Sequence, residues 1–445
     1  MRSFSFDAMI PQLLFVTGNG NNQEIEERIK VASQNPAYTE IFLSQVPVDN
    51  ALVEGLMERL ISKKWDGVHL SQCMGMIPEL IQVCAPLVEK FSIMGDFECL
   101  DKEAADAISD ALQQSKIKKL LLRVQLSPDL ANALYQATVS ESCNLQELIL
   151  PISHTCDASI ERLAQALMHS KTLKTLRLNR NGLTWKIDER QMETLMIALK
   201  GHPSLQELSI QGSSCTASSM EAICQHVLPS LKRLDLRNHR IGGDSLCGLP
   251  SLAAALSSSS NCTLKSLILS GHSLSESETR LLVDAISSQN CQLEELQLNK
   301  CNLDDVSVTI LGNHLPQMHH LAVLQLRDNP FVGTNGCCDG LQALLQGVRQ
   351  NYELEQMVLP TTRHMGAMGD EMEDLKAQIY YQLALNRAGR KLLRTTVPLS
   401  VWPVLLSRVR EALDCDYSSH HGSMTGIHCA DAVYHLLHGP ALLQR

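Results

Sequence analysis

The sequence predicts an α/β solenoid, a horseshoe with parallel strands on its concave face, helices on its convex face and a helical cap at the C-terminal end. Three observations predict this fold. An L-x-x-L-x-L pattern recurs along most of the 445 residues. Apolar residues recur at helical spacing between successive copies. Aromatic residues make up 4% of the chain and the whole apolar class 44%, so the core is aliphatic, which suits thin stacked layers.

The strand pattern occurs in six regular copies and six weaker ones. The regular copies are Leu173-Leu176-Leu178, Leu205-Leu208-Ile210, Leu231-Leu234-Leu236, Leu264-Leu267-Leu269, Leu293-Leu296-Leu298 and Leu321-Leu324-Leu326. The weaker copies are Tyr38-Ile41-Leu43, Trp65-Val68-Leu70, Val88-Phe91-Ile93, Ile117-Leu120-Leu122, Leu145-Leu148-Leu150 and Leu354-Met357-Leu359. Their starts are separated by between 23 residues (Trp65 to Val88) and 33 residues (Leu231 to Leu264), mostly enough for a helix in each repeat.

Each repeat is predicted to bury one face of its strand and expose the other. Successive strand side chains point to opposite faces, so Leu176 and Leu178 are expected to point into the core. Thr175, Arg177 and Asn179 are then expected to point outward. Stacked neighbouring repeats supply the core that one repeat alone lacks.

This pattern resembles the ribonuclease-inhibitor-like leucine-rich-repeat family over roughly residues 38 to 360. The family has an Asn or Cys three residues after the last strand leucine, and Asn181, Cys301 and Asn329 match that position. Their side chains are expected to satisfy backbone groups in the turn that leaves the strand. Ser213, His239 and His272 depart from the pattern, although each is still able to form hydrogen bonds.

The predicted domains are an N-terminal cap (1–37), an array of about twelve repeats (38–360), a connector (361–374) and a helical C-terminal cap (375–445). Terminal repeats of a solenoid are atypical because they must cover an open apolar face. Residues 1–37 lack the repeat pattern, and the connector contains several glycines and acids. The C-terminal cap is expected to hold two helices, at 375–397 and 399–413.

The C-terminal cap also resembles a segment attached to leucine-rich-repeat proteins of some microalgae. The resemblance lies in residues 380–390 (YYQLALNRAGR) and in Val401-Trp402-Pro403. It implies source and domain organisation, and it implies no activity.

Composition favours an intracellular protein, cytoplasmic or nuclear, that binds neither nucleic acid nor membranes. The formal net charge of −10 argues against a nucleic-acid grip, which depends on surplus Lys and Arg. No run approaches the roughly 20 apolar residues of a membrane span, and the first 18 residues make a poor secretory signal. The 15 cysteines include no C-x-x-C pair, which is typical of a reducing compartment.

Several cysteines occupy equivalent positions in their repeats. Cys143, Cys262 and Cys291 each lie two residues before the first strand leucine. A small buried thiol behaves as a modest hydrophobe, so packing is favoured over regulatory disulfides. Cys337 and Cys338 are likewise expected to pack a helix.

The sequence predicts no catalytic, cofactor or metal site. It contains neither a G-x-S-x-G elbow nor a G-x-x-x-x-G-K-[ST] phosphate loop, and residues 333–336 are assigned to a repeat turn. The histidines gathered between His420 and His438, together with Cys429, are the one metal candidate. They lack recognisable ligand spacing, so a solvated stripe on a helix is the favoured interpretation.

The outward strand positions are the candidate partner-binding residues, because Arg with flanking acids and amides offers bidentate hydrogen bonds and a selective charge pattern. Any single one also has the simpler interpretation of a solvated strand residue. The candidates are Arg177, Asn179, Glu207, Gln211, Arg233, Asp235, Arg237, Glu295, Gln297, Asn299, Gln325 and Arg327. Toward the N-terminal half the face is expected to be more apolar, with Leu121 and Ile149 outward.

The function predicted from these features is a noncatalytic scaffold or adaptor that binds a protein partner on the concave surface. The repeat type also resembles that of Ran GTPase activators, so regulation of a small GTPase is the alternative, without the long acidic tail typical of those proteins. An innate-immune-type sensor is a further alternative, although no nucleotide-binding domain precedes the repeats. Partner identity and oligomeric state are not determined by the sequence.

Overall fold

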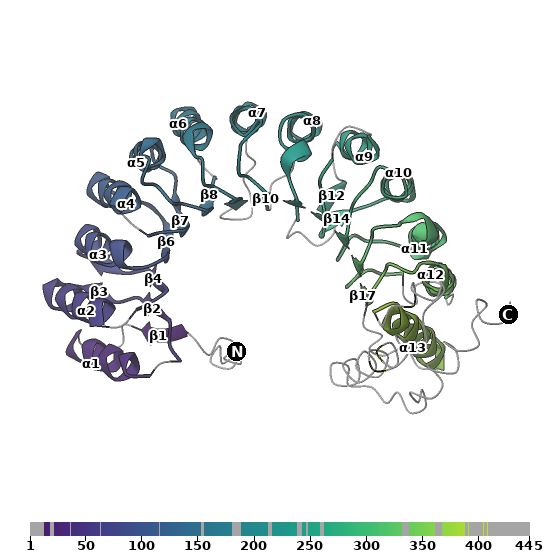
Figure 1. Ribbon diagram of the computed structural model, residues 1–445, viewed down its shortest axis with the longest axis horizontal. Coiled ribbons are helices and arrows are strands. Elements are labelled where there is room, and N and C mark those ends of the chain that lie inside the picture. The colour runs from purple at the N-terminus through teal and green to yellow at the C-terminus, as the bar shows by residue number, and fades with distance from the viewer. Residues whose placement is uncertain are drawn as a thin grey trace. The chain divides into compact units, whose positions relative to one another are not determined.

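The computed structural model describes residues 13–17, 22–35, 37–62, 64–114, 116–152, 155–179, 188–211, 216–237, 243–245, 248–258, 262–331, 338–360, 367–387, 390, 404 and 407. The chain divides into two units. The first contains residues 1–213 and 225–231, and the second contains residues 214–224 and 232–445. Each unit is an α/β solenoid of the leucine-rich-repeat type, with strands along one side and helices along the other (Figure 1).

The first unit contains eight neighbouring parallel strands. In sheet order they are β1 (Leu13–Thr17), β2 (Glu40–Ser44), β4 (Gly67–Ser71), β6 (Lys90–Cys99), β7 (Lys119–Gln125), β8 (Glu147–Pro151), β9 (Thr175–Asn179) and β10 (Glu207–Ile210). A separate short pair joins β3 (Pro47–Val48) to β5 (Met74–Gly75). The helices are α1 (Asn22–Ser33), α2 (Asn50–Ser62), α3 (Ile77–Cys84), α4 (Lys102–Gln114), α5 (Pro128–Val139), α6 (Asp157–His169) and α7 (Glu189–Ala198).

The second unit has the same architecture with shorter strands. In sheet order they are β11 (Arg233–Asp235), β13 (Ser266–Ile268), β15 (Glu295–Gln297), β16 (Val323–Gln325) and β17 (Gln356–Val358). The short strands β12 (Gly243–Ser245) and β14 (His272–Ser273) pair separately. The helices are α9 (Leu249–Ser257), α10 (Glu276–Ile286), α11 (Asp305–His314), α12 (Asp339–Gln350) and α13 (Ala367–Arg387), while α8 (Ala217–His226) spans the division between the units.

The core of each repeat lies between its strand and its helix. Leu176 and Leu178 of β9 are 0% and 1% exposed, which confirms the predicted alternation. From α7, the helix that follows β9, Met192 and Leu195 are buried as well. Burying one such side chain stabilises the folded protein by roughly 1.5–3 kcal/mol. Each repeat adds a layer of buried aliphatic side chains and so adds to the stability of the solenoid.

Polar side chains begin several of the helices. The side chains of Ser127, Asp188, Ser275 and Asp304 accept backbone N–H groups at the starts of α5, α7, α10 and α11. Each cap satisfies a donor that the first helical turn leaves unpaired and is worth about 1 kcal/mol. In these repeats the cap therefore fixes the residue at which the helix begins.

All twelve predicted strands are present, and β1 is an additional strand that the sequence analysis missed. β1 pairs in register with β2, and α1 follows it, so residues 13–33 form a strand and helix where no repeat pattern was expected. The sequence LLFVT conceals the strand because it lacks an L-x-x-L-x-L copy, and only Val16 in it is fully buried. The capping role of this region stays a prediction.

The helix after the array begins at Ala367 rather than Leu375, inside the expected connector, and ends at Arg387. Side chains of this helix hydrogen-bond to backbone carbonyls of the last repeat. Lys376 Nζ donates to the Pro360 carbonyl (2.7 Å), and Asn386 Nδ2 donates to the Leu354 carbonyl (2.8 Å). The expected helix at 399–413 lies outside the described residues, apart from Val404 and Ser407.

Candidate functional site

The strand face of each unit, meaning the side of the sheet opposite the helices, carries most of the polar side chains that the sequence singled out. Parallel, in-register pairing places the outward residues of successive strands in columns across the sheet. Arg233, Ser266 and Glu295 form one column in the second unit. In the first unit Glu40, Gly67 and Lys90 occupy the equivalent column.

In the second unit these columns hold two groups of ion pairs and hydrogen bonds, together called the Arg233 network. Arg233, Ser266, Glu295 and Gln297 form the first group, and Asp235 and Arg237 form the second. Glu295 lies at the centre of the first group. Its carboxylate accepts hydrogen bonds from Arg233 (3.1 Å), Ser266 (2.6 Å) and Gln297 (2.5 Å). Arg237 pairs with both carboxylate oxygens of Asp235 through Nε (3.0 Å) and through Nη2 (2.8 Å to Oδ2).

The pKa of Glu295 lies below its ordinary value because of this network. Burial alone raises the pKa, but the hydrogen bonds from Ser266 and Gln297 and the charge of Arg233 outweigh that effect. Arg233 and Glu295 stand on strands separated by β13, and the small side chain of Ser266 between them leaves room for the pair to meet. The network is therefore ordered before any partner arrives.

The other predicted residues of the second unit, Asn299, Gln325 and Arg327, form a separate hydrogen-bonded cluster beside this network. Asn299 Nδ2 donates to Gln325 Oε1 (3.1 Å), and Asn299 Oδ1 accepts the Arg327 backbone N–H (2.8 Å). The Arg327 side chain is exposed, and no ion pair joins it to another described residue. Arg327 is thus a cation available to an external group.

In the first unit the predicted residues are brought together only in part. Arg177 lies 3.5 Å from Glu147 and 4.0 Å from Glu207, and Glu147 also pairs with Lys119 (3.0 Å). Gln211 is half-buried, and its backbone N–H donates to the Leu178 carbonyl. The Asn179 side chain lies outside the described part of the chain.

A second network on the strand face of the first unit was missed by the sequence analysis. The rings of Phe15 and Phe42 stack at 4.7 Å between centroids, and the Phe42 and His69 rings stack at 6.2 Å. His69 Nε2 lies 3.0 Å from Glu40 and Nδ1 lies 2.7 Å from the Ser92 hydroxyl. Phe42 and His69 occupy the same outward column as Arg177, so the spacing of the repeats is sufficient to predict that they face outward. Phe15 lies in the same column, but predicting it requires β1 to be recognised as a strand.

Glu40 anchors this N-terminal network. The pKa of Glu40 is lowered to about 2. The hydrogen bond with His69 lowers it most, burial raises it, and the hydrogen bond from Lys90 Nζ (2.5 Å) lowers it further. Lys90 reaches Glu40 across Gly67, and a Cβ on Gly67 would lie 3.2 Å from His69 Nε2. As in the Arg233 network, a small residue lets charges two strands apart meet.

The expected apolar stretch of the strand face is only partly accessible. Leu121 is half-buried at its outward position. Ile149 shares the outward column of Arg177, as expected, but it is 6% exposed and so offers little accessible apolar surface.

The predicted turn ladder is confirmed where it is described. Asn329 Oδ1 accepts the Cys301 N–H (2.8 Å), and Nδ2 donates to the carbonyls of Leu298 and Leu326. The Cys301 thiol donates to the Leu269 carbonyl (3.4 Å), and Cys73, unnoticed in the sequence, donates equivalently to Leu43 (3.5 Å). Asn181, Ser213 and His239 lie outside the described residues.

Burial distinguishes the cysteines. It raises the thiol pKa of Cys143, Cys262 and Cys291, in agreement with a packing role. Cys156 differs: its side chain is exposed at the start of α6, and the hydroxyl and N–H of Ser159 lower its pKa. Cys338 is buried at the start of α12, while Cys337 lies outside the described residues.

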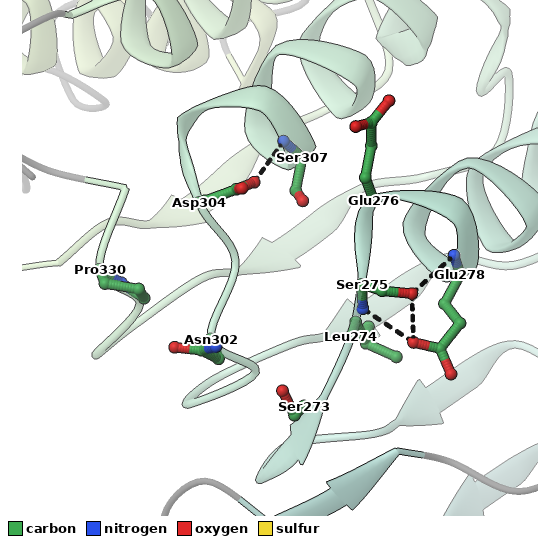
Figure 2. A pocket seen from close by; sticks show the side chains of 9 residues that line it. All are labelled: Ser273, Leu274, Ser275, Glu276, Glu278, Asn302, Asp304, Ser307 and Pro330. Atoms are coloured by element: carbon green, nitrogen blue, oxygen red, sulfur yellow. Dashed lines mark hydrogen bonds between the residues drawn. The ribbon is translucent and has the colours of Figure 1, made fainter. Parts of the chain in front are cut away.

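One cavity of about 420 Å³ opens beside the starts of α10 and α11 (Figure 2). Its lining is acidic, with Glu276, Glu278 and Asp304. The helix N-termini there are already capped: Glu278 accepts the Ser275 N–H (2.8 Å), and Asp304 accepts the Ser307 N–H (2.8 Å). These carboxylates therefore serve their own helices.

The described residues contain no cluster of three or more His, Cys, Asp or Glu side chains arranged to hold a metal ion. None of their helices is both long and apolar enough to cross a membrane. The His420–His438 segment and the turn at 333–336 lie outside the described residues.

Comparison with known proteins identifies the relatives of the repeats. No protein-family model matches the chain. It is 29% identical to pig (Sus scrofa) ribonuclease inhibitor over 240 residues, 48% of this chain and 52% of the relative. It is 31% identical to human NACHT, LRR and PYD domains-containing protein 5 over 226 residues, 50% of this chain and 18% of that protein. The chain thus spans about half the length, or less, of these relatives.

A solved structure, the leucine-rich repeat-containing protein LegL7 of Legionella pneumophila, is also similar. It matches with a TM-score of 0.45 and 15% identity over 70% of this chain and 97% of that one.

Proposed function

We propose that this chain, a ribonuclease-inhibitor-like leucine-rich-repeat protein, is a noncatalytic scaffold that holds a protein partner on the strand face of its repeats. The observation that carries the proposal is the Arg233 network. Its charged and amide groups are fixed in position by one another, so a partner meets a preorganised pattern of donors and acceptors.

The relatives support a protein partner. The pig relative is named as an inhibitor of ribonucleases, which are proteins. An intracellular location is part of the proposal, because the cysteines whose side chains are described are free thiols, as a reducing compartment allows. The outward residues named from the sequence are the proposed contact residues, with exposed Arg327 as the first to meet an acidic group. Asp235 is the exception: it is 5% exposed, so its proposed role is to position Arg237.

The test reverses one exposed charge on the strand face and leaves buried Asp235 in place. Arg327→Glu changes an exposed arginine that no ion pair holds among the described residues. The matched control is Arg280→Glu, at an exposed arginine on α10. Affinity purification from the native cell is expected to lose the specific partner with the first variant and keep it with the second. Retention with both variants would contradict the proposed surface.

Regulation of a small GTPase stays the alternative prediction, and one observation favours it. Arg327 presents an exposed guanidinium at the end of β16, where it is accessible to a nucleotide-bound partner. GTP hydrolysis by a panel of small GTPases is expected to stay unchanged when the protein is added if it is only a scaffold. Acceleration that disappears with Arg327→Ala would replace the scaffold function with this one.

A further inference from the structure

Among the described residues, no strand pairs with the outer edge of β1. In other repeats the residue equivalent to Leu13 donates its N–H to the preceding strand: Glu147 to the Lys118 carbonyl (2.8 Å) and Thr175 to the Gln146 carbonyl (3.0 Å). N–H and C=O groups alternate sides along a strand, so those of Leu13, Phe15 and Thr17 point away from β2. No strand among the described residues precedes β1 to accept them.

The opposite end of the array shows how such an edge is otherwise covered. Beside β17, side chains of α13 hydrogen-bond to the carbonyls left by the last repeat: Asn386 to Leu354, Arg387 to Glu355 (3.2 Å) and Lys376 to Pro360. No equivalent contact covers β1 within the described part of the chain.

The side chains of β1 also lack the features that keep an edge unpaired. Natural edge strands are protected by charged residues, especially Lys, by Pro or by bulges. Residues 13–17, LLFVT, contain no charge, and Phe15 is 44% exposed in the middle of the strand. This edge therefore suits another uncharged strand.

We propose that the β1 edge pairs with β1 of a second copy of this chain, antiparallel, with a two-fold axis at Phe15. That axis places Phe15 opposite its own counterpart and Leu13 opposite Thr17. The residues whose N–H and C=O groups face the edge then meet as hydrogen-bonded pairs, and both cores stay on the same side of the joined sheet. The stack of Phe15, Phe42 and His69 continues across the axis into the second copy.

This pairing does not depend on the proposed partner. A single strand pair buries less area than a standard protein interface, so the dimer is expected to dissociate on dilution.

The test uses complementary charges at the axis. Phe15→Glu places two carboxylates opposite each other, and Phe15→Lys two ammonium groups, so each variant is expected to be monomeric. An equimolar mixture of the two is expected to form a heterodimer. Met168→Glu, at a side chain on α6 that is 64% exposed, is the matched control and is expected to dimerise as the unaltered chain does.

Light scattering after size exclusion measures the masses, and hydrogen exchange measures protection of the Leu13, Phe15 and Thr17 amides. The proposal is supported if the unaltered chain is a dimer with protected amides, both single variants are monomers, and the equimolar mixture of the variants is again a dimer. A dimer that survives Phe15→Glu would overturn it, because the interface then lies elsewhere. A chain that stays monomeric at millimolar concentration would also overturn it; protected amides in that monomer would assign the edge to another segment of the same chain.

Discussion

Donors of three chemical kinds occupy the same position at the end of the strands. Asn329 uses an amide, Cys301 a thiol and His272 a ring N–H, since His272 Nε2 lies 2.7 Å from the Leu236 carbonyl. The three side chains are nearly fully buried. A buried carbonyl left without a donor costs roughly 1–3 kcal/mol, which explains why different residues retain the same bond.

His272 is expected to make the stability of the second unit sensitive to pH. Burial lowers its pKa in the folded protein, so below about pH 6.5 the unfolded chain binds a proton that the folded chain resists. The free energy of unfolding is expected to fall as pH decreases from that value toward the lowered pKa. Asn at this position keeps a donor without titrating, so His272→Asn should reduce the difference between urea unfolding at about pH 7.5 and about pH 5.5.

The matched control for this experiment is His320→Asn, at an exposed side chain. An unchanged pH dependence in His272→Asn would show that the proton is taken up elsewhere. His202, also buried with a lowered pKa, would be the next residue to replace.

The helices α11 and α12 approach each other closely because glycines line their contact. A Cβ added to Gly347 would lie 2.2 Å from the Gly312 carbonyl oxygen, and one added to Gly312 would lie 2.5 Å from the Ala343 carbonyl carbon. Backbone atoms cannot move aside as a flexible side chain can. The spacing of this helix pair is therefore set by two residues without side chains.

Gly347→Ala is expected to lower the free energy of unfolding by about 3 kcal/mol, because the two helices must separate. Gly201→Ala is the control. Gly201 has φ +65° and nothing within 4 Å of its added Cβ, so only backbone strain of about 1 kcal/mol is expected. Urea unfolding measures both, and equal losses would contradict the packing argument.

Sequence periodicity predicted the elements better than it predicted the site. Leucine spacing located twelve strands, because the core imposes the same pattern on every repeat. It missed β1, whose single fully buried residue Val16 leaves no pattern to detect. It placed Arg233 and Glu295 on one face but could not pair them, since they lie 62 residues apart and meet only across Ser266.

Within a unit, helices pack mainly on the helices next to them and strands pair only with neighbouring strands. A disturbance is therefore expected to stay close to its origin. Leu56 in α2 is 1% exposed, and Leu56→Ala should cost roughly 2–5 kcal/mol. Hydrogen exchange should accelerate in β2 and β4 and stay unchanged in β15 and β16. Acceleration across both sets of strands would show global cooperativity instead.

The regular strand register also determines how a molecule of this kind can change in length. The Lys118 carbonyl accepts the N–H groups of Gln146 and Glu147, and the Gln146 carbonyl accepts those of Lys174 and Thr175. If residues 147–174 were deleted, Thr175 would follow Gln146 directly. Its N–H would then donate to the Lys118 carbonyl, which now accepts the Glu147 N–H. Gain or loss of one whole repeat conserves every donor and acceptor at the new junction, whereas a partial repeat leaves some of them unpaired. Repeat number is thus a variable that evolution can alter in single steps.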